Sequence, residues 1–111
     1  MFENQIPDWP NFARNPLAAA KPEFTNPTPE LYPLAGPNEP QGWGLSFMIT
    51  PSQTGRTRNS AQWAGLANLF WWCDREKGVG GLIASQVLPF GDPKVLPLWA
   101  EVEKTVFDSL V

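Results

Sequence analysis

Histidine is absent from this 111-residue sequence, and cysteine occurs once. The absence of histidine excludes Ser-His and Cys-His catalytic pairs and imidazole metal ligands. A lone Cys73 excludes an intrachain disulfide and a thiolate metal cluster. We therefore expect no metal and no cofactor. We interpret Cys73, which ends an apolar run beside Asp74, as a buried and unreactive thiol.

Basic charge and long apolar runs are also scarce. Eight Lys and Arg residues stand against eleven Asp and Glu, and the basic residues are spread along the chain. This pattern gives no electrostatic footprint for nucleic acid or for an anionic membrane. No apolar run approaches the roughly 20 residues of a membrane-spanning helix, and the start of the sequence does not resemble a signal peptide. We expect no nucleic-acid partner, no membrane association and a cytoplasmic location.

Proline, by contrast, is abundant and unevenly placed, with nine of the thirteen prolines in residues 1–41. Each proline ring removes a backbone donor and disfavours helix at the residue before it. We therefore predict an extended, irregular arm over residues 1–41 and a sheet-and-helix portion over residues 42–111. The arm is too rich in apolar side chains for a pure linker and should dock them on a surface inside or outside this chain: Phe2, Ile6, Trp9, Phe12, Phe24, Leu31 and Tyr32.

The patterning of apolar residues changes at residue 42. Apolar residues alternate with small or polar ones over 43–50, which predicts a strand with one apolar face that ends at Pro51. A polar loop follows over 52–60, where Arg56 and Arg58 are expected to be solvated. The more uniformly apolar run 61–73 predicts a second strand, covered on both faces.

The remaining sequence predicts a hairpin and a helix. The charged segment 74–78 indicates a solvated turn in which Gly78 adopts positive φ, and 79–88 would return as a strand that packs closely at Gly80 and Gly81. Gly91-Asp92-Pro93 indicates a helix start, followed by apolar residues at helical spacing. Pro97 would remove one backbone bond early in this helix. The predicted fold class is α+β, with three antiparallel strands and a C-terminal helix that covers only one face.

In this order the segments resemble the C-terminal end of the serine β-lactamase family, which includes penicillin-binding proteins, class C β-lactamases, related carboxylesterases and fungal acyltransferases. The matching phrases over residues 42–111 are "GWGLSFMIT", "WAG" (63–65), "LANLFWWC", "DREKG" and "VGGLIASQVLP", followed by the helix from Asp92. The phrase "NLFWWCDREKGV" ties the sequence to the fungal branch. The resemblance implies a fragment of the β-lactamase/DD-peptidase-like fold, preceded by the proline-rich arm.

The same resemblance implies a substrate pocket at Trp63, Ala64, Gly65 and Leu66. The first three match the third active-site box of the family in its Trp-x-Gly form, with Trp63 standing where β-lactamases have a lysine. A neutral indole cannot pair with a substrate carboxylate, which fits an esterase or acyltransferase better than a lactamase. The backbone N–H of Leu66 would be an oxyanion-hole donor, and Gly65 would leave the strand edge open to the acyl group.

We interpret the three tryptophans of the 61–73 run, Trp63, Trp71 and Trp72, differently. On an unbroken strand Trp71 shares the face of Trp63 but lies far from the box, and Trp72 occupies the other face. We assign Trp63 to the cleft. We predict that Trp71 and Trp72 are core side chains packed against helical layers, one of which need not lie in this chain.

The two other boxes of the family are missing. None of Ser46, Ser52, Ser60 and Ser85 has a lysine three residues later, as Ser-x-x-Lys requires, and Tyr32 does not begin a Tyr-x-Asn box. Two functions remain open. The first is a β-lactamase-related serine hydrolase or acyltransferase for acyl or ester small molecules, here truncated and inactive alone. The second is a non-catalytic interaction module or remnant that uses its Trp-rich and Pro-rich surface, with self-association through exposed strands.

Overall fold

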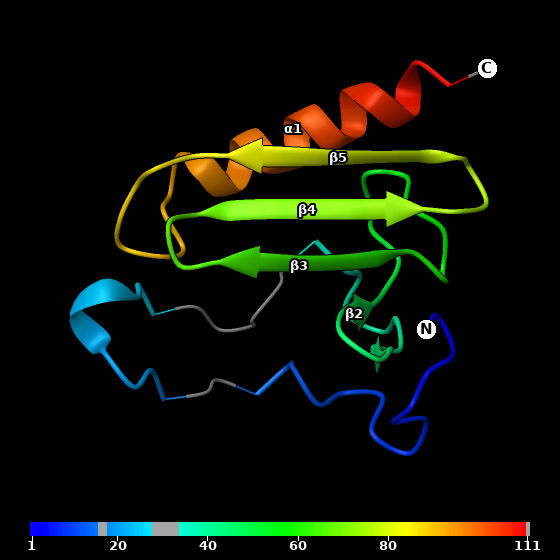
Figure 1. Ribbon diagram of the computed structural model, residues 1–111, viewed down its shortest axis with the longest axis horizontal. Helices are drawn as coiled ribbons and strands as arrows, with labels where there is room; N and C mark the ends of the chain where they lie inside the picture. The colour runs from blue at the N-terminus through cyan, green and yellow to red at the C-terminus, as the bar shows by residue number, and fades with distance from the viewer. Residues whose placement is uncertain (16–17, 28–33, 111) are drawn as a thin grey trace.

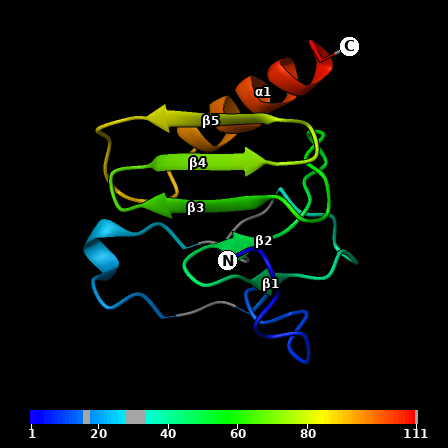
Figure 2. The ribbon, with the colours of Figure 1, turned by 45° about the vertical axis from the view of Figure 1, so that its right-hand side comes forward.

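The structure, a computed structural model, describes residues 1–15, 18–27 and 34–110 (Figure 1). A five-stranded antiparallel sheet runs in the sequential order β1-β2-β3-β4-β5. Its α+β class is confirmed, because α1 lies behind the sheet on its β5 side (Figures 1 and 2). The elements are η1 (Pro22–Phe24), β1 (Gly42–Trp43), β2 (Met48–Ile49), β3 (Ala61–Gly65), β4 (Leu69–Asp74), β5 (Val79–Ala84) and α1 (Val95–Asp108).

The expectation of three strands is wrong, because two of the predicted strands are hairpins. The first, 43–50, divides into β1 and β2. The chain turns at Gly44, whose N–H donates to Phe47 O at 2.8 Å, and Leu45 and Ser46 lie exposed at the tip. Apolar alternation continues through a turn of two residues, so the pattern does not reveal it.

The second predicted strand, 61–73, divides into β3 and β4 with a turn over residues 66–68. Asn68 adopts a φ of 56° in this turn. Asparagine is several-fold enriched among residues with this left-handed conformation. Leu66 and Ala67 are as apolar as the strand residues around them, which conceals the turn in the sequence.

The hairpin between 61–73 and 79–88 is confirmed as β4 and β5. Gly78 adopts a φ of 67° at its tip, as predicted. Gly80 and Gly81 lie close against β4, also as predicted, and β5 ends at Ala84 rather than at residue 88.

The start of α1 follows the predicted signal closely. Asp92 Oδ1 accepts hydrogen bonds from Lys94 N at 2.8 Å and Val95 N at 2.9 Å. Pro97 is the third residue of the helix. Leu96 N donates to Asp92 O at 3.1 Å and Leu98 N to Lys94 O at 3.2 Å, so the proline removes the one backbone bond that would lie between them, as predicted.

The described part of the arm docks on the sheet of this chain. The Gln5 N–H donates to Trp43 O at 2.8 Å. The Phe2 ring packs on that of Phe47, with centroids 4.8 Å apart. Trp9 departs from the expected docking, because it is 67% exposed.

The arm also reaches the opposite end of the sheet, where Thr25 forms a parallel bridge with Phe90 (Figure 1). Leu31 and Tyr32 lie outside the described residues. The division of the chain into residues 1–41 and 42–111 stays a prediction.

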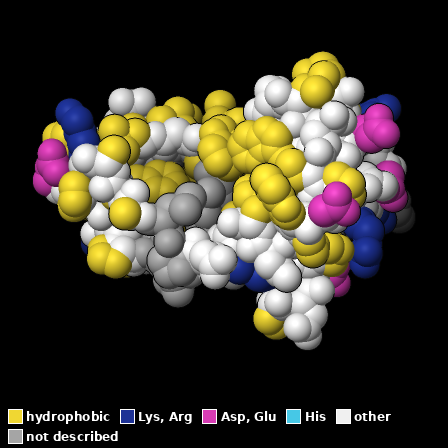
Figure 3. Space-filling view, turned by 90° about the horizontal axis from the view of Figure 1, so that it is seen from below, with side chains coloured by type: hydrophobic (Ala, Val, Ile, Leu, Met, Phe, Trp, Pro, Cys, Tyr) yellow, Lys and Arg dark blue, Asp and Glu magenta, His cyan; other side chains and the backbone are white. Residues whose placement is uncertain are grey.

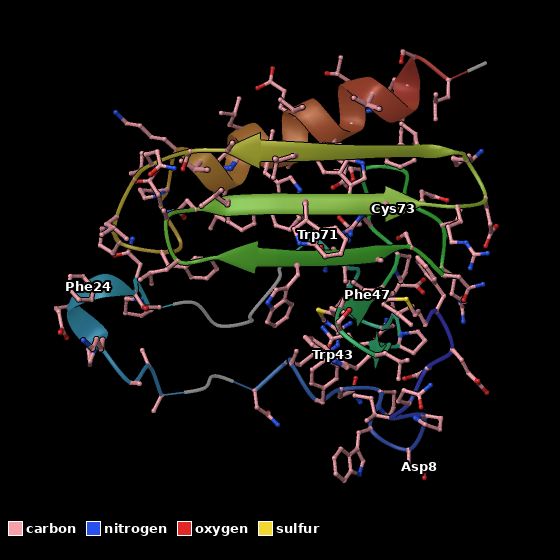
Figure 4. The ribbon with its side chains drawn as sticks, in the orientation of Figure 1. Asp8, Phe24, Trp43, Phe47, Trp71 and Cys73 are labelled. Atoms are coloured by element: carbon pink, nitrogen blue, oxygen red, sulfur yellow. The ribbon has the colours of Figure 1, made fainter. Side chains whose placement is uncertain are left out.

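The sheet has two apolar faces, and α1 covers one of them. On this face Phe70 of β4 stacks on Trp99 of α1, with centroids 4.4 Å apart. The buried residues of this core are Ala13, Met48, Phe70, Trp72, Val95, Trp99 and Phe107. On the opposite face, which Figure 4 shows in front, Phe47, Ile49 and Ala61 form a smaller cluster with Phe2, Trp71 and Cys73 around it. No α-helix among the described residues covers that second face.

Candidate functional site

The four residues predicted to form a pocket lie together at the C-terminal end of β3. Trp63, Ala64 and Gly65 are its last three residues, and Leu66 begins the turn that follows. On one side β4 pairs with all of β3, whereas on the other side β2 pairs only with Ala61 and Gln62. No described strand therefore borders β3 from Trp63 onward.

Aromatic rings surround the first residue of this segment. The half-buried Trp63 meets Trp43 edge to face, with centroids 4.5 Å apart and planes at 89°. Phe12 of the arm meets Trp43 in the same way at 6.1 Å. Trp63 thus stands in an aromatic row that carries no charge, as a wall for an uncharged group requires.

The other two tryptophans divide between the faces of the sheet. Trp72 lies in the core beneath α1, as predicted. Trp71 pairs with Trp63 across the ladder, so the two share a face but are direct neighbours rather than distant. Trp71 is half-buried and meets Phe47 at 6.2 Å on the face without a helix (Figure 4). No α-helix of the described residues packs on Trp71, so the helical layer expected over this face is not among them.

Gly65 is a glycine that the fold does not require. A Cβ built at this position would meet only Leu69 side-chain atoms, at 3.8 and 3.9 Å, which is ordinary contact. Its φ lies outside the left-handed region. Neither the packing of the described residues nor the backbone conformation therefore demands glycine at position 65.

Leu66 leaves a backbone donor unused beside this glycine. Its side chain is 55% exposed. Among the backbone hydrogen bonds of the described residues, none uses the Leu66 N–H as a donor. A free peptide N–H at an open strand end can donate to an oxygen on which negative charge develops.

The sequence analysis missed Asn68, which anchors the turn after Leu66. It is fully buried, and its amide bonds to the backbone of the segment that joins β5 to α1. The signal that could have found it is an asparagine near the middle of an apolar run, since asparagine favours turns and tolerates positive φ.

The loop 52–60 holds a second group that was missed. Arg56, expected to be solvated, is buried, and its Nε lies 2.7 Å from Glu103 Oε1 of α1. Burial lowers the pKa of the Arg56 guanidinium, while the carboxylates of Glu103 and Asp74 oppose this effect. Arg58 agrees with the prediction, because it is exposed and lies 3.4 Å from Glu39.

Asp74 likewise differs from the expected solvated turn, because it is buried at the end of β4. Its carboxylate accepts hydrogen bonds from Thr57 N at 2.7 Å, from the Thr57 hydroxyl at 3.0 Å, and from the N–H groups of Glu76 and Lys77 at 3.0 Å. Burial raises the pKa of the Asp74 carboxyl, but these hydrogen bonds outweigh it and hold the pKa below its ordinary value. Asp74 therefore fastens loop 52–60 to the hairpin.

The part of the chain that the structure describes shows neither a metal site nor a membrane-spanning helix. No group of three or more His, Cys, Asp or Glu side chains is arranged to hold a metal ion there. No helix in this part combines the length and apolar character needed to cross a bilayer. Cys73 is half-buried rather than buried, and it lies at the end of β4 remote from Gly65.

Known proteins resemble this chain in sequence and in fold, although no protein-family model matches it. The acyltransferase calJ of Penicillium decumbens is 47% identical over 55 residues, which cover 50% of this chain and 13% of that protein. Simvastatin synthase of Aspergillus terreus, in its LovD9 mutant form, superposes with a TM-score of 0.59 at 25% identity. This match covers 62% of the present chain and 19% of the synthase. The unliganded selenomethionyl synthase gives a TM-score of 0.58 at 24% identity, over 61% and 18% of the two chains.

The sheet with its C-terminal helix is thus part of a β-lactamase-like fold. Over this portion the chain is similar to β-lactamase-like fungal acyltransferases, which confirms the resemblance indicated by its sequence. It spans 13% of the curated relative and 19% of the solved synthase.

Proposed function

We propose that residues 63–66 form the acyl-binding wall of a β-lactamase-related acyl-transfer site whose nucleophilic serine lies outside these 111 residues. The observation that carries this proposal is the Leu66 N–H, which has no acceptor among the described residues. It lies beside Gly65, a glycine that the described packing does not require, where no described strand borders β3. The likeness to calJ, an acyltransferase by name, supports acyl transfer as the chemistry.

In this site an acyl or ester substrate forms an acyl-serine, and its carbonyl oxygen becomes negatively charged in each tetrahedral intermediate. The Leu66 N–H donates to that oxygen, and Gly65 lets the acyl group approach the strand. Trp63 forms a neutral side of the pocket. A carboxylate on the acyl group would find no cationic partner in the row of Trp63, Trp43 and Phe12, so we propose uncharged acyl groups as substrates.

The sharpest test uses a chimera of the acyltransferase calJ in which the portion equivalent to residues 42–111 of this chain is replaced by those residues. We expect the chimera to retain acyl transfer. Leu66→Pro removes the N–H and should lower kcat by about 10²- to 10³-fold, the usual effect of losing one oxyanion-hole donor. Leu66→Ala is the matched control, because it shortens the same side chain and keeps the N–H. Equal kcat for the two variants would overturn the proposed role of the wall.

The 111-residue chain alone should not turn over esters, because no Ser-x-x-Lys sequence is present to supply the covalent nucleophile. When the chain is incubated with p-nitrophenyl acetate, p-nitrophenol should be released no faster than in buffer without the chain. A burst of nitrophenol that scales with the chain concentration would contradict the proposal of a truncated, inactive form.

A second candidate, a non-catalytic interaction module, is favoured by the sheet face without a helix. Leu82 on this face is 60% exposed and pairs with the half-buried Trp71. On a different surface, seen from below in Figure 3, hydrophobic side chains also gather, with charged side chains beside them. Apolar patches of this kind are typical of protein-protein contacts. A module of this kind should bind a partner protein in the absence of any acyl substrate. The acyl-transfer proposal does not require such an association.

A further inference from the structure

One buried side chain ties the turn after the proposed wall to a second loop. Asn68 is 0% exposed. Its amide nitrogen donates to Val87 O and Pro89 O, both at 2.8 Å. Its Oδ1 accepts from Gly91 N at 2.9 Å and from Asp92 N at 3.0 Å. An amide side chain has two N–H donors and an oxygen with two lone pairs, so Asn68 uses its full capacity on this loop.

Further hydrogen bonds join the same two segments but do not replace this clamp. Ser85 Oγ donates to Ala67 O at 2.8 Å and to Asn68 O at 3.0 Å. Val87 N donates to Ala67 O at 3.3 Å. These bonds hold carbonyl groups of the turn, whereas Asn68 alone among the side chains of residues 66–68 reaches the loop 87–92.

The clamp also connects the turn to the helix. Asp92, whose N–H donates to Asn68, accepts the first N–H groups of α1 through its own carboxylate. The turn 66–68 is therefore positioned relative to α1 and its core, in addition to the β3–β4 ladder. Because the turn has only three residues, fixing Asn68 at one end and Gly65 at the other leaves the Leu66 peptide little freedom.

We propose that Asn68 is a positioning residue that holds the Gly65–Leu66 peptide in the orientation of the acyl-binding wall. The acyl ligand rests on the function proposed above, but the positioning is a property of the chain that can be measured without substrate. Other residues cannot reproduce it. Glycine would keep the positive φ and lose all four side-chain bonds, and aspartate would keep the acceptors and lose both donors.

Amide-resolved NMR of the ¹⁵N-labelled 111-residue chain tests this inference with Asn68→Gly. The N–H groups of Gly91 and Asp92 should exchange about tenfold faster, as expected for the net loss of one hydrogen bond. The Gly65 and Leu66 resonances should shift, while exchange at Trp72 in the centre of the ladder stays unchanged. The matched control is Asn59→Gly, the same substitution at an exposed loop position, which should leave all of these signals in place.

Two results would overturn the inference. If Gly65 and Leu66 keep their resonances while Gly91 exchanges faster, Asn68 holds the loop and not the wall. If protection falls equally at Trp72, Asn68 contributes only to global stability. Should Asn68→Gly fail to fold, Asn68→Asp replaces it. Its retained acceptor keeps Gly91 protected, and the loss of the two donors is then read from the shift of the Leu66 resonance; an unshifted Leu66 resonance would overturn the inference.

The chimera with the acyltransferase calJ separates this inference from the proposed function. Asn68→Gly should lower kcat more than it raises KM. A misplaced donor reduces the stabilisation of the transition state more than it reduces the affinity for the substrate. Absence of acyl transfer in the unsubstituted chimera would count against the proposed function, and the NMR result would still decide whether Asn68 positions the Leu66 peptide.

Discussion

The Trp72 indole of β4 lies directly over Gly81 of β5. The two residues are partners in the ladder, and a Cβ built on Gly81 would lie 2.2 Å from the ring atoms Cζ2 and Cη2 of Trp72. The absence of a Cβ at Gly81 leaves room for the Trp72 indole in the core beneath α1. Gly65, in contrast, has no such neighbour.

The two glycines therefore make a matched pair for substitution by alanine. Gly81→Ala forces the Trp72 ring or the β5 backbone to move, and we expect a loss of about 1–3 kcal/mol in the free energy of unfolding. Gly65→Ala should change it by less than about 0.5 kcal/mol. Urea denaturation followed by tryptophan fluorescence measures both. Similar losses for the two variants would show that Gly65 has a structural requirement after all.

A second prediction concerns the buried pair of Arg56 and Glu103, whose side chains are both 0% exposed. The Arg56 Nη1 and Nη2 atoms have no hydrogen-bond partner among the described residues, so Glu103 is its main compensation. Glu103 also accepts from Trp99 Nε1 at 3.0 Å. We expect Glu103→Gln to lower the free energy of unfolding by about 3–5 kcal/mol, because an unpaired buried charge remains.

Two control variants test this explanation: one changes an exposed glutamate of the same helix, and the other replaces both members of the pair. Glu101→Gln makes the same change at an exposed position of α1 and should alter stability by less than about 0.5 kcal/mol. The double substitution Arg56→Met, Glu103→Leu should recover most of the loss, since it removes both charges. A double variant as unstable as Glu103→Gln would show that the loss comes from packing and not from the unpaired charge.

A third prediction follows from the lowered pKa of Asp74. Because its folded-state pKa lies below the unfolded value, the stabilisation by the carboxylate is fully present above about pH 4 and is lost as the pH falls through the folded value. Asp74→Asn should therefore be less stable than the unsubstituted chain at pH 7, by about 1.5–3 kcal/mol for hydrogen bonds to a charged group. The difference should shrink as the pH is lowered below 4. A difference that is constant from pH 7 to pH 3 would contradict this linkage.

The sequence predicted the order of the elements and missed two turns, for a physical reason. At residues 66–68 the turn depends on Asn68, whose four hydrogen-bond partners lie 19 to 24 residues later in the chain. Apolar periodicity reports only local burial, so a turn stabilised by distant backbone groups leaves no periodic signal. The β4–β5 turn was predictable because its charged residues and Gly78 carry the signal locally.

For the candidate site, too, some features carry a local signal in the sequence and others depend on residues far away in the chain. A short box of fixed spacing predicts a pocket at Trp63, Ala64, Gly65 and Leu66; these residues lie together at the end of β3, and their role in a site stays a prediction. The burial of Arg56 and Asp74 could not be predicted from the sequence, because loop arginines and hairpin carboxylates are exposed in most proteins. Their partners, Glu103 and Thr57, approach them only after folding.

The last prediction concerns the sheet face without a helix. Leu82 is 60% exposed there and pairs with Trp71, and we propose that this face mediates self-association of the chain. Sedimentation velocity should then show an association that depends on concentration, and Leu82→Glu should abolish it, because a charge would be buried without a partner in the contact. Leu98→Glu is the matched control, since Leu98 is 48% exposed on α1, on the other side of the sheet. A monomeric chain at all concentrations, or an equal effect of both substitutions, would contradict an interface on this face.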